Sequence, residues 1–225
     1  GLIAPDVFIG IAEETGTIVG IDRWVLDEAC AAAARIRGAV PEFCMSVNIS
    51  SRDLREPDLP DVVARVLANH ALPPSALSVE VTETVALDDS VLPVLTRLHA
   101  LGIGVAMDDF GIGYSSLSYL KRLPISVLKV DRSFVRDVAN DRYDEAIIAS
   151  IVAIAHGLGF RVIAEGIEDD SQLRRIAALG CDEAQGFYFG RPQTLVAFER
   201  YLGGSRTARP ALRAVPSEPR AAAFG

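Results

Sequence analysis

Hydrophobic and polar residues alternate along this chain in a way that predicts helices and strands in turn. Apolar residues at helical spacing predict helices over about 5–15, 18–37, 60–69, 87–101, 115–122, 142–157 and 169–179. Short apolar runs predict strands over 43–49, 77–81, 103–108, 125–131, 160–165 and within 182–189. Helices that separate strands at this spacing are typical of parallel strands joined by right-handed crossovers.

One helix carries enough apolar residues to predict which of its sides is buried. Within residues 18–37, helical spacing connects Ile21, Trp24, Val25, Ala29 and Ile36. We therefore expect Trp24 to pack in the core rather than to form a platform for a substrate.

The number of predicted strands can be compared with the number that a closed barrel or an open sheet requires. Six strands are expected, whereas a closed parallel barrel needs eight. The pattern therefore predicts an α/β fold, a (β/α)₈ barrel whose first two strands are not in this chain. An open doubly wound sheet fits six strands equally well by number, but nothing resembles its phosphate-binding glycine fingerprint.

Composition predicts one domain followed by a tail. The chain has 225 residues, of which 50% are hydrophobic, enough for a single substantial core. We expect this domain to occupy residues 1–202. Residues 203–225 are rich in Arg, Pro and Ala and lack a periodic pattern, which predicts a disordered tail.

The net charge and the length of the apolar runs limit which binding partners and which cellular location we expect. The formal net charge is −8, which argues against nonspecific binding to DNA or to anionic membranes. Because no apolar run reaches the length of a bilayer span and no signal-peptide pattern opens the chain, we expect a soluble, cytoplasmic segment. Cys30, Cys44 and Cys181 lie far apart, which favours a reducing compartment and core packing over zinc binding.

Polar residues mark the carboxyl ends of the predicted strands. They are Asn48, Glu80, Asp108, Asp109, Lys129, Glu165 and Gln185. In a parallel barrel these ends converge on one face, where such enzymes build their sites. Each carboxylate taken alone is more often a solvated loop residue or a helix cap. Taken together, the residues predict one shared site.

The residue types limit the chemistry of that site. Oxygen ligands without His or Cys suit hard cations such as Mg²⁺ or Mn²⁺, and the adjacent Asp108 and Asp109 can hold two ions close together. Paired metals clamp the attacking and leaving oxygens of a displacement at phosphorus. Lys129, set among carboxylates, would remain charged and orient water or phosphate rather than act as a base. The alternative is that Lys129 only pairs with Asp131 as a structural salt bridge.

Several motifs carry a resemblance to a known family. They are NIS at 48–50, EVTET at 80–84, MDDFGIGYSSL at 107–117, LKVDRSF at 128–134, AEGIE at 164–168 and GCDEAQGFYFGRP at 180–192. The opening GLIAPDVFIGIAEETGTIVGIDRWVLDEAC takes part in the same match. From residue 1 to about 202 the chain resembles the EAL-domain family of cyclic di-GMP phosphodiesterases.

The resemblance implies an activity and a metal site. The family folds as a modified (β/α)₈ barrel and hydrolyses one phosphodiester bond of cyclic di-GMP, giving linear pGpG. The implied ligands of two Mg²⁺ or Mn²⁺ ions are Asn48, Glu80, Asp108, Asp109 and Glu165.

The resemblance also implies roles next to the metal. Lys129 would contact the catalytic water, Asp131 would support it, and Gln185 would lie near metal-bound water or substrate. Glu83 would brace the loop 109–116, which in the family couples the site to dimerisation, so a homodimer is expected. Ile112 in this loop stands where the family usually has Thr.

The family's remaining parts lie outside this sequence. The Glu-Ala-Leu motif, with a ligating Glu and a nearby substrate-binding Arg, belongs on the family's second strand, and this chain begins after it. We expect a longer parent chain with upstream sensory or GGDEF domains. Two alternatives follow: a catalytically impaired domain that acts as a cyclic di-GMP receptor or protein-interaction module, and a fragment that does not fold alone.

Overall fold

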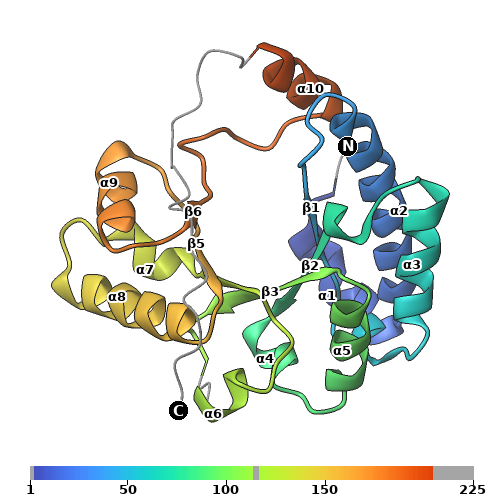
Figure 1. Ribbon diagram of the computed structural model, residues 1–225, viewed down its shortest axis with the longest axis horizontal. Helices are drawn as coiled ribbons and strands as arrows, with labels where there is room; N and C mark the ends of the chain where they lie inside the picture. Colours follow the sequence, from blue (N-terminus) through green and yellow to red (C-terminus); the bar gives the residue numbers. More distant parts are fainter. Residues whose placement is uncertain (1–2, 114–116, 205–225) are drawn as a thin grey trace, which may run out of the picture.

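Six parallel strands form the centre of the molecule. The computed structural model describes residues 3–113 and 117–204. Its strands are β1 (Met45–Asn48), β2 (Leu77–Thr82), β3 (Gly104–Phe110), β4 (Val127–Val130), β5 (Arg161–Ala164) and β6 (Glu183–Ala184). Each strand pairs with its neighbours in sequence order, so β1 and β6 are the edges of the described sheet. The strands follow an arc with helices on its outside, which confirms the predicted α/β fold as a six-stranded half-barrel (Figure 1).

Most predicted helices are present, and their ends follow local sequence signals. They are α1 (Pro5–Thr15), α2 (Ile18–Arg37), α3 (Leu59–Asn69), α5 (Leu92–Ala100), α6 (Leu117–Leu120), α8 (Arg142–Gly157) and α9 (Asp170–Ala178). Helix α1 begins with Pro5 in its first turn and ends at Gly16, whose φ of 80° is left-handed. Helix α5 begins at Leu92, later than the predicted residue 87.

Several short helical elements and the last helix were not predicted from the pattern of hydrophobic positions. These are α4 (Glu83–Ala86), α7 (Arg132–Arg136), α10 (Leu195–Gly204) and the 3₁₀ turns η1 (Asp53–Arg55) and η2 (Pro74–Ala76). One turn of helix is too short to show a period of 3.6 residues. The first two residues of the predicted tail, 203 and 204, end α10, and the rest of that tail lies outside the described residues.

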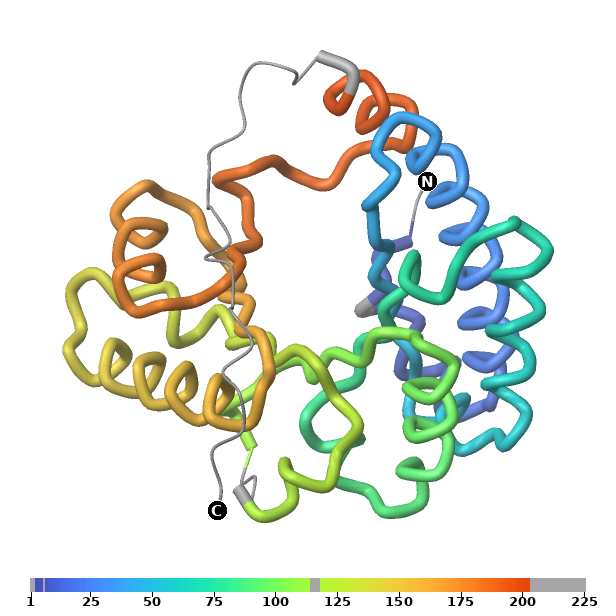
Figure 2. The backbone as a smooth tube through the Cα atoms, viewed as in Figure 1, coloured from blue at the N-terminus to red at the C-terminus, as the bar shows by residue number. Residues whose placement is uncertain are grey.

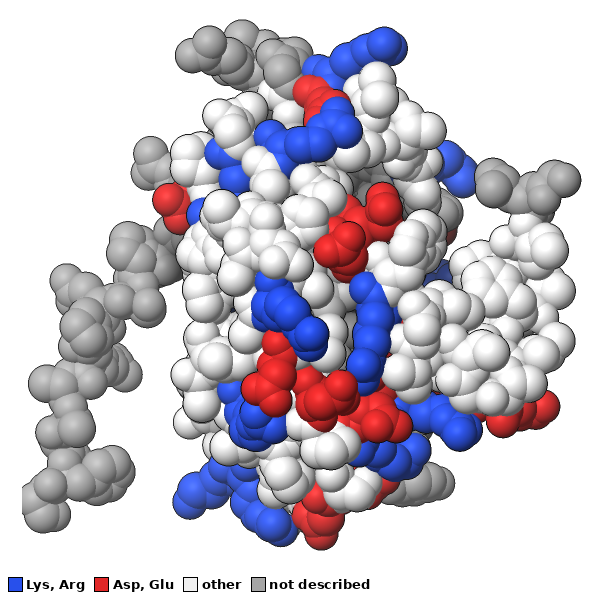
Figure 3. Space-filling model, turned by 90° about the vertical axis from the view of Figure 1, so that its right-hand side faces the viewer, with Lys and Arg blue, Asp and Glu red and all other residues white. Residues whose placement is uncertain are grey.

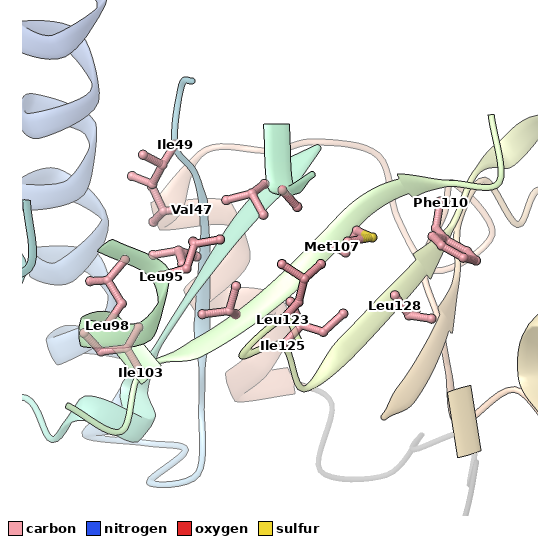
Figure 4. Packing of buried hydrophobic residues seen from close by; sticks show 14 of the residues in the cluster. Val47, Ile49, Leu95, Leu98, Ile103, Met107, Phe110, Leu123, Ile125 and Leu128 are labelled. Atoms are coloured by element: carbon pink, nitrogen blue, oxygen red, sulfur yellow. The ribbon is translucent and has the colours of Figure 1, made fainter. Parts of the chain in front are cut away.

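The two faces of the sheet differ in polarity. Val47, Val79 and Val105 are buried on one face, in register across β1, β2 and β3, and Met107 and Leu128 continue that face. This face packs against the surrounding helices and contains much of the hydrophobic core (Figure 4). Because side chains alternate along a strand, the residue after each of these aliphatics points to the other face, where the polar strand-end residues lie.

Helix α2 buries a different side from the one predicted. Its buried residues are Ile18, Asp22, Leu26, Cys30, Ala33 and Ile36. Trp24 is 63% exposed and Val25 36% exposed, so the predicted core position of Trp24 is wrong. The row of buried residues includes a carboxylate, Asp22. A pattern that counts only apolar residues therefore does not detect this row. Cys30 and Cys181 are buried as predicted, whereas Cys44 is exposed.

After β6 the chain crosses to the β1 side of the molecule, where helix α10 lies beside α2 (Figure 2). Glu199 of α10 pairs with Arg35 of α2 at 2.9 Å, and the rings of Phe198 and Phe43 lie 6.3 Å apart. A hollow of about 780 Å³ lies beneath this contact, and Gln185 and Phe43 are among the residues that line it. No helix in residues 3–113 and 117–204 is both long and apolar enough to cross a membrane.

Acidic and basic side chains are interspersed on the side of the molecule where α2, α3 and α5 lie (Figure 3). Several ion pairs account for the mixture: Arg23–Asp58 at 2.8 Å, Arg55–Asp88 at 2.9 Å and Arg97–Asp61 at 2.9 Å. These pairs are partly or largely exposed, so each contributes little to stability.

Candidate active site

Lys129 lies at the centre of a group of carboxylates on the polar face of the sheet. Its Nζ atom is 2.6 Å from Glu165 Oε1, 2.7 Å from Glu80 Oε2 and 3.1 Å from Asp108 Oδ1. The Lys129 side chain is 4% exposed. The alternative that Lys129 pairs only with Asp131 is therefore wrong, because strands β2, β3 and the end of β5 each bring a partner to it.

A bulge in β3 brings two adjacent aspartates to the same side. The register between β3 and β4 shifts between Met107 and Phe110, and Asp109 has a φ of 54°. Asp is one of the residue types that tolerate this left-handed conformation. Without the bulge, Asp108 and Asp109 would point to opposite faces. With it, carboxylate oxygens of Asp108, Asp109 and Glu165 all lie within 4.8 Å of one another.

The charges in this group influence one another strongly. Burial alone would lower the pKa of Lys129, but hydrogen bonds to Glu165 and Glu80 and their negative charges outweigh it and raise that pKa. Burial raises the pKa of Glu165, although Lys129 acts in the opposite direction. Burial, followed by repulsion from Asp108 and Asp131, raises the pKa of Asp109. We therefore expect Lys129 to stay protonated at neutral pH.

Two further predicted residues hold the backbone around the group. Glu83, the first residue of α4, is 3% exposed, and its Oε2 accepts hydrogen bonds from the backbone N–H of Gly111 at 3.0 Å and of Gly113 at 3.2 Å. Asp131 is the N-cap of α7, and its Oδ1 accepts from the N–H of Ser133 at 2.8 Å. Glu83 thus holds the loop after β3, and Asp131 starts the helix after β4.

The remaining predicted residues lie at the two edges of the sheet. Asn48 ends β1, in register with Glu80 on β2. Gln185 follows β6, and its N–H donates to the carbonyl oxygen of Ala164, the residue before Glu165, at 2.8 Å. Both side chains are exposed. The sheet therefore places them on either side of the Lys129 group, Asn48 on β1 and Gln185 just after β6.

The donor atoms suit a hard divalent cation. Asp108 and Asp109 on β3 and Glu165 after β5 offer three carboxylates from either side of β4, and Glu80 adds a fourth next to Lys129. Carboxylate and amide oxygens are the ligands that Mg²⁺ and Mn²⁺ prefer. The residues present therefore fit such an ion.

Two buried carboxylates beside β1 were not predicted. Asp22 on α2 is 7% exposed and Asp53 in η1 is 0% exposed. The signal in the sequence was an Asp at position 22 between Ile18 and Leu26, on one side of a helix. A charge within such a stripe indicates a polar partner on the element packed against it.

Comparison with known proteins agrees with this geometry. Residues 1–192 match the family described as EAL domain. The chain is 45% identical over 195 residues to the bifunctional diguanylate cyclase/cyclic di-GMP phosphodiesterase MucR of Pseudomonas aeruginosa, covering 85% of this chain and 28% of that protein. It is 41% identical over 219 residues to the cyclic di-GMP phosphodiesterase NbdA of the same species, covering 96% of this chain and 28% of that protein.

Solved structures show the same architecture. The PaMucR phosphodiesterase in complex with c-di-GMP aligns with a TM-score of 0.83 and 44% identity, covering 88% of this chain and 81% of that chain. A manganese and cyclic di-GMP complex of BlrP1 from Klebsiella pneumoniae aligns with a TM-score of 0.75 and 32% identity, covering 84% of this chain and 48% of that chain. This chain belongs to the EAL-domain family.

Proposed function

We propose that this chain forms the catalytic part of a metal-dependent phosphodiesterase that hydrolyses cyclic di-GMP to linear pGpG. The observation that carries the proposal is the meeting of Lys129 with Glu80, Asp108 and Glu165 on one face of the sheet. Relatives that share this architecture are cyclic di-GMP phosphodiesterases or were solved with cyclic di-GMP bound.

The proposed ligands of the metal are Asn48, Glu80, Asp108, Asp109 and Glu165. Two Mg²⁺ or Mn²⁺ ions are the proposed cofactors, and the BlrP1 complex with manganese supports this choice of ion. When bound, such ions lower the pKa of water and neutralise charge on the phosphodiester oxygens.

The protein side chains would orient the reactants. Lys129 stays protonated, so it would donate hydrogen bonds to the attacking water or to a phosphate oxygen rather than remove a proton. Asp131 would hold the segment after Lys129 through the cap of α7. Gln185, at the edge of the sheet nearest Glu165, would contact substrate or water. Glu83 would fix the loop after β3 through the N–H groups it binds.

The test is turnover by the purified chain. The chain is incubated with cyclic di-GMP and Mn²⁺, and linear pGpG is measured by chromatography, with a chelator as the negative control. Glu165→Gln should abolish product, whereas Glu168→Gln, which removes an exposed carboxylate three residues away, should not. Full activity in Glu165→Gln would refute the proposed site.

The same assay separates the proposal from a receptor function. A folded chain that binds cyclic di-GMP but forms no product would act as a receptor, and the phosphodiesterase proposal would fail for this chain. The chain spans 28% of the length of MucR and of NbdA. A homodimer and upstream sensory or GGDEF domains remain predictions for the parent protein.

A further inference from the structure

A buried carboxylate on α2 contacts the chain just after β1. Helix α2 packs on β1 (Figure 1). Asp22 is one of the buried residues of this helix. Asp22 Oδ2 accepts a hydrogen bond from the backbone N–H of Ser50 at 3.0 Å. Ser50 is two residues after Asn48, the proposed metal ligand that ends β1.

Ser50 extends this contact into the next turn. Its hydroxyl oxygen accepts from the backbone N–H of Asp53 at 3.2 Å, and its carbonyl oxygen accepts from the N–H of Leu54 at 3.1 Å. Asp22 therefore holds the residue whose two oxygens accept hydrogen bonds from the first two residues of η1. Through Ser50, the turn that leads into η1 is connected to α2.

The residue after Asp22 makes a second tie to the same turn. Arg23 donates to Asp53 Oδ1 from Nε at 3.3 Å and from Nη2 at 3.1 Å. Asp53 is 0% exposed, and its Oδ2 has no hydrogen-bond partner among the described residues. Two adjacent residues of α2 thus bind two ends of one short segment.

A buried carboxylate is a poor choice for stability alone. Removing a carboxylate from water is costly, and an apolar side chain at position 22 would continue the stripe formed by Ile18 and Leu26. Strand β1 is an edge of the described sheet, so its register is set by β2 on one side only. A contact just beyond its carboxyl end supplies a second constraint on Asn48.

We propose that Asp22 is a positioning residue for Asn48. By holding Ser50, it fixes the end of β1 and so the direction of the Asn48 amide toward Glu80 and the rest of the metal site. This inference rests on the proposed function, since it takes Asn48 as a metal ligand. Groups that orient a ligand typically change metal affinity by about 10–100-fold when removed.

The experiment measures Mn²⁺ affinity of the purified chain by titration calorimetry, without nucleotide. Asp22→Ala should weaken Mn²⁺ binding by roughly 10–100-fold. Asp22→Asn keeps a carbonyl oxygen for the Ser50 N–H and should retain affinity within about threefold of the wild type. Leu26→Ala, on the same buried side of α2, should lower the melting temperature without changing Mn²⁺ affinity.

A second measurement uses the metal-free chain. Hydrogen exchange at the Ser50 amide should be at least about tenfold faster in Asp22→Ala than in Leu26→Ala when both are compared well below their melting temperatures. If the Ser50 amide exchanges equally fast in Asp22→Ala and in Leu26→Ala, the inference is overturned, whether or not the wild type binds Mn²⁺. Equal Mn²⁺ affinities in the wild type and Asp22→Ala would also overturn it. Failure of the wild type to bind Mn²⁺ would instead refute the proposed metal site, and the role of Asp22 at that site with it.

Discussion

Replacing Lys129 with Met tests whether its ammonium group holds the site together. The variant keeps an unbranched apolar side chain of nearly the same length but removes the positive charge that lies within 3.1 Å of three carboxylates. Two unit charges about 3 Å apart interact by about 5–6 kcal/mol at an effective dielectric constant near 20, before the desolvation of both groups is subtracted. The partners Glu80, Asp108 and Glu165 are 10%, 15% and 19% exposed, so water can replace only part of that interaction.

The expected loss is therefore that of a broken buried ion pair. Removing one partner of such a pair destabilises a protein by about 3–5 kcal/mol, because the other charge stays buried. For a domain of this size, that loss lowers the melting temperature by about 6–20 °C. The matched control is Arg55→Met, which breaks an ion pair to Asp88 whose side chains are 51% and 35% exposed. Because water screens this pair, its loss should lower stability far less than the loss of the Lys129 ammonium.

The pH dependence gives the sharper readout. Burial already raises the pKa of Glu165 above 4.5, and loss of the neighbouring ammonium raises that pKa further. A carboxyl group with a raised pKa in the folded state contributes stability below its unfolded pKa and loses it as pH rises through the folded value. The deficit of Lys129→Met relative to the wild type should thus be largest at pH values above the raised pKa of Glu165 and shrink as the pH falls toward the ordinary carboxyl range.

Metal-free urea unfolding at several pH values measures this deficit. A deficit no larger than that of Arg55→Met, or one that grows toward acid pH, would refute the assignment of Lys129 as the cation that compensates the buried carboxylates.

Three other substitutions test separate parts of the structure. Glu83→Ala should lower turnover by about 10–100-fold while the chain stays folded, because the loop 109–113 loses the acceptor for two of its N–H groups; circular dichroism and the pGpG assay check this. Gly186→Ala should destabilise the chain by more than about 3 kcal/mol, since an added Cβ would lie 2.1 Å from a backbone oxygen; urea unfolding measures the change. Gly20→Ala, where an added Cβ meets nothing within 4 Å, should instead stabilise α2 by about 0.5–1 kcal/mol, and an unchanged or lower melting temperature would contradict this.

Helix ends could be predicted because single residues decide them. Pro5 starts α1 and Gly16 ends it, and the predicted bounds of α2 and α8 also agree with the structure. Such signals are local, so they can be found without knowing the fold. The side that α2 buries could not be predicted in the same way, because Asp22 is accepted in the core only through its bond to Ser50, which lies on another element.

The candidate site was also predictable only in part: its residues could be identified from the sequence, but the contacts between them could not. The strand-end residues could be found because polar residues recur at the ends of successive predicted strands, which together indicate one shared site although no single one does. Their contacts could not. Lys129 and its three partners come from different strands, and the bulge that turns Asp109 toward Asp108 depends on the register between β3 and β4. An ideal strand ending at residue 108 would have separated the two aspartates.

The protein itself supplies a positive charge that holds three of the carboxylates at this site in place. In the folded chain the Lys129 ammonium satisfies Glu80, Asp108 and Glu165 directly. The carboxylates are therefore held in place before any cation arrives, and binding does not have to order them. Asp109 has no such partner among the ion pairs of the described residues, and burial and repulsion raise its pKa. A divalent cation next to Asp109 would offset this repulsion and so lower the pKa that burial and the neighbouring carboxylates raise.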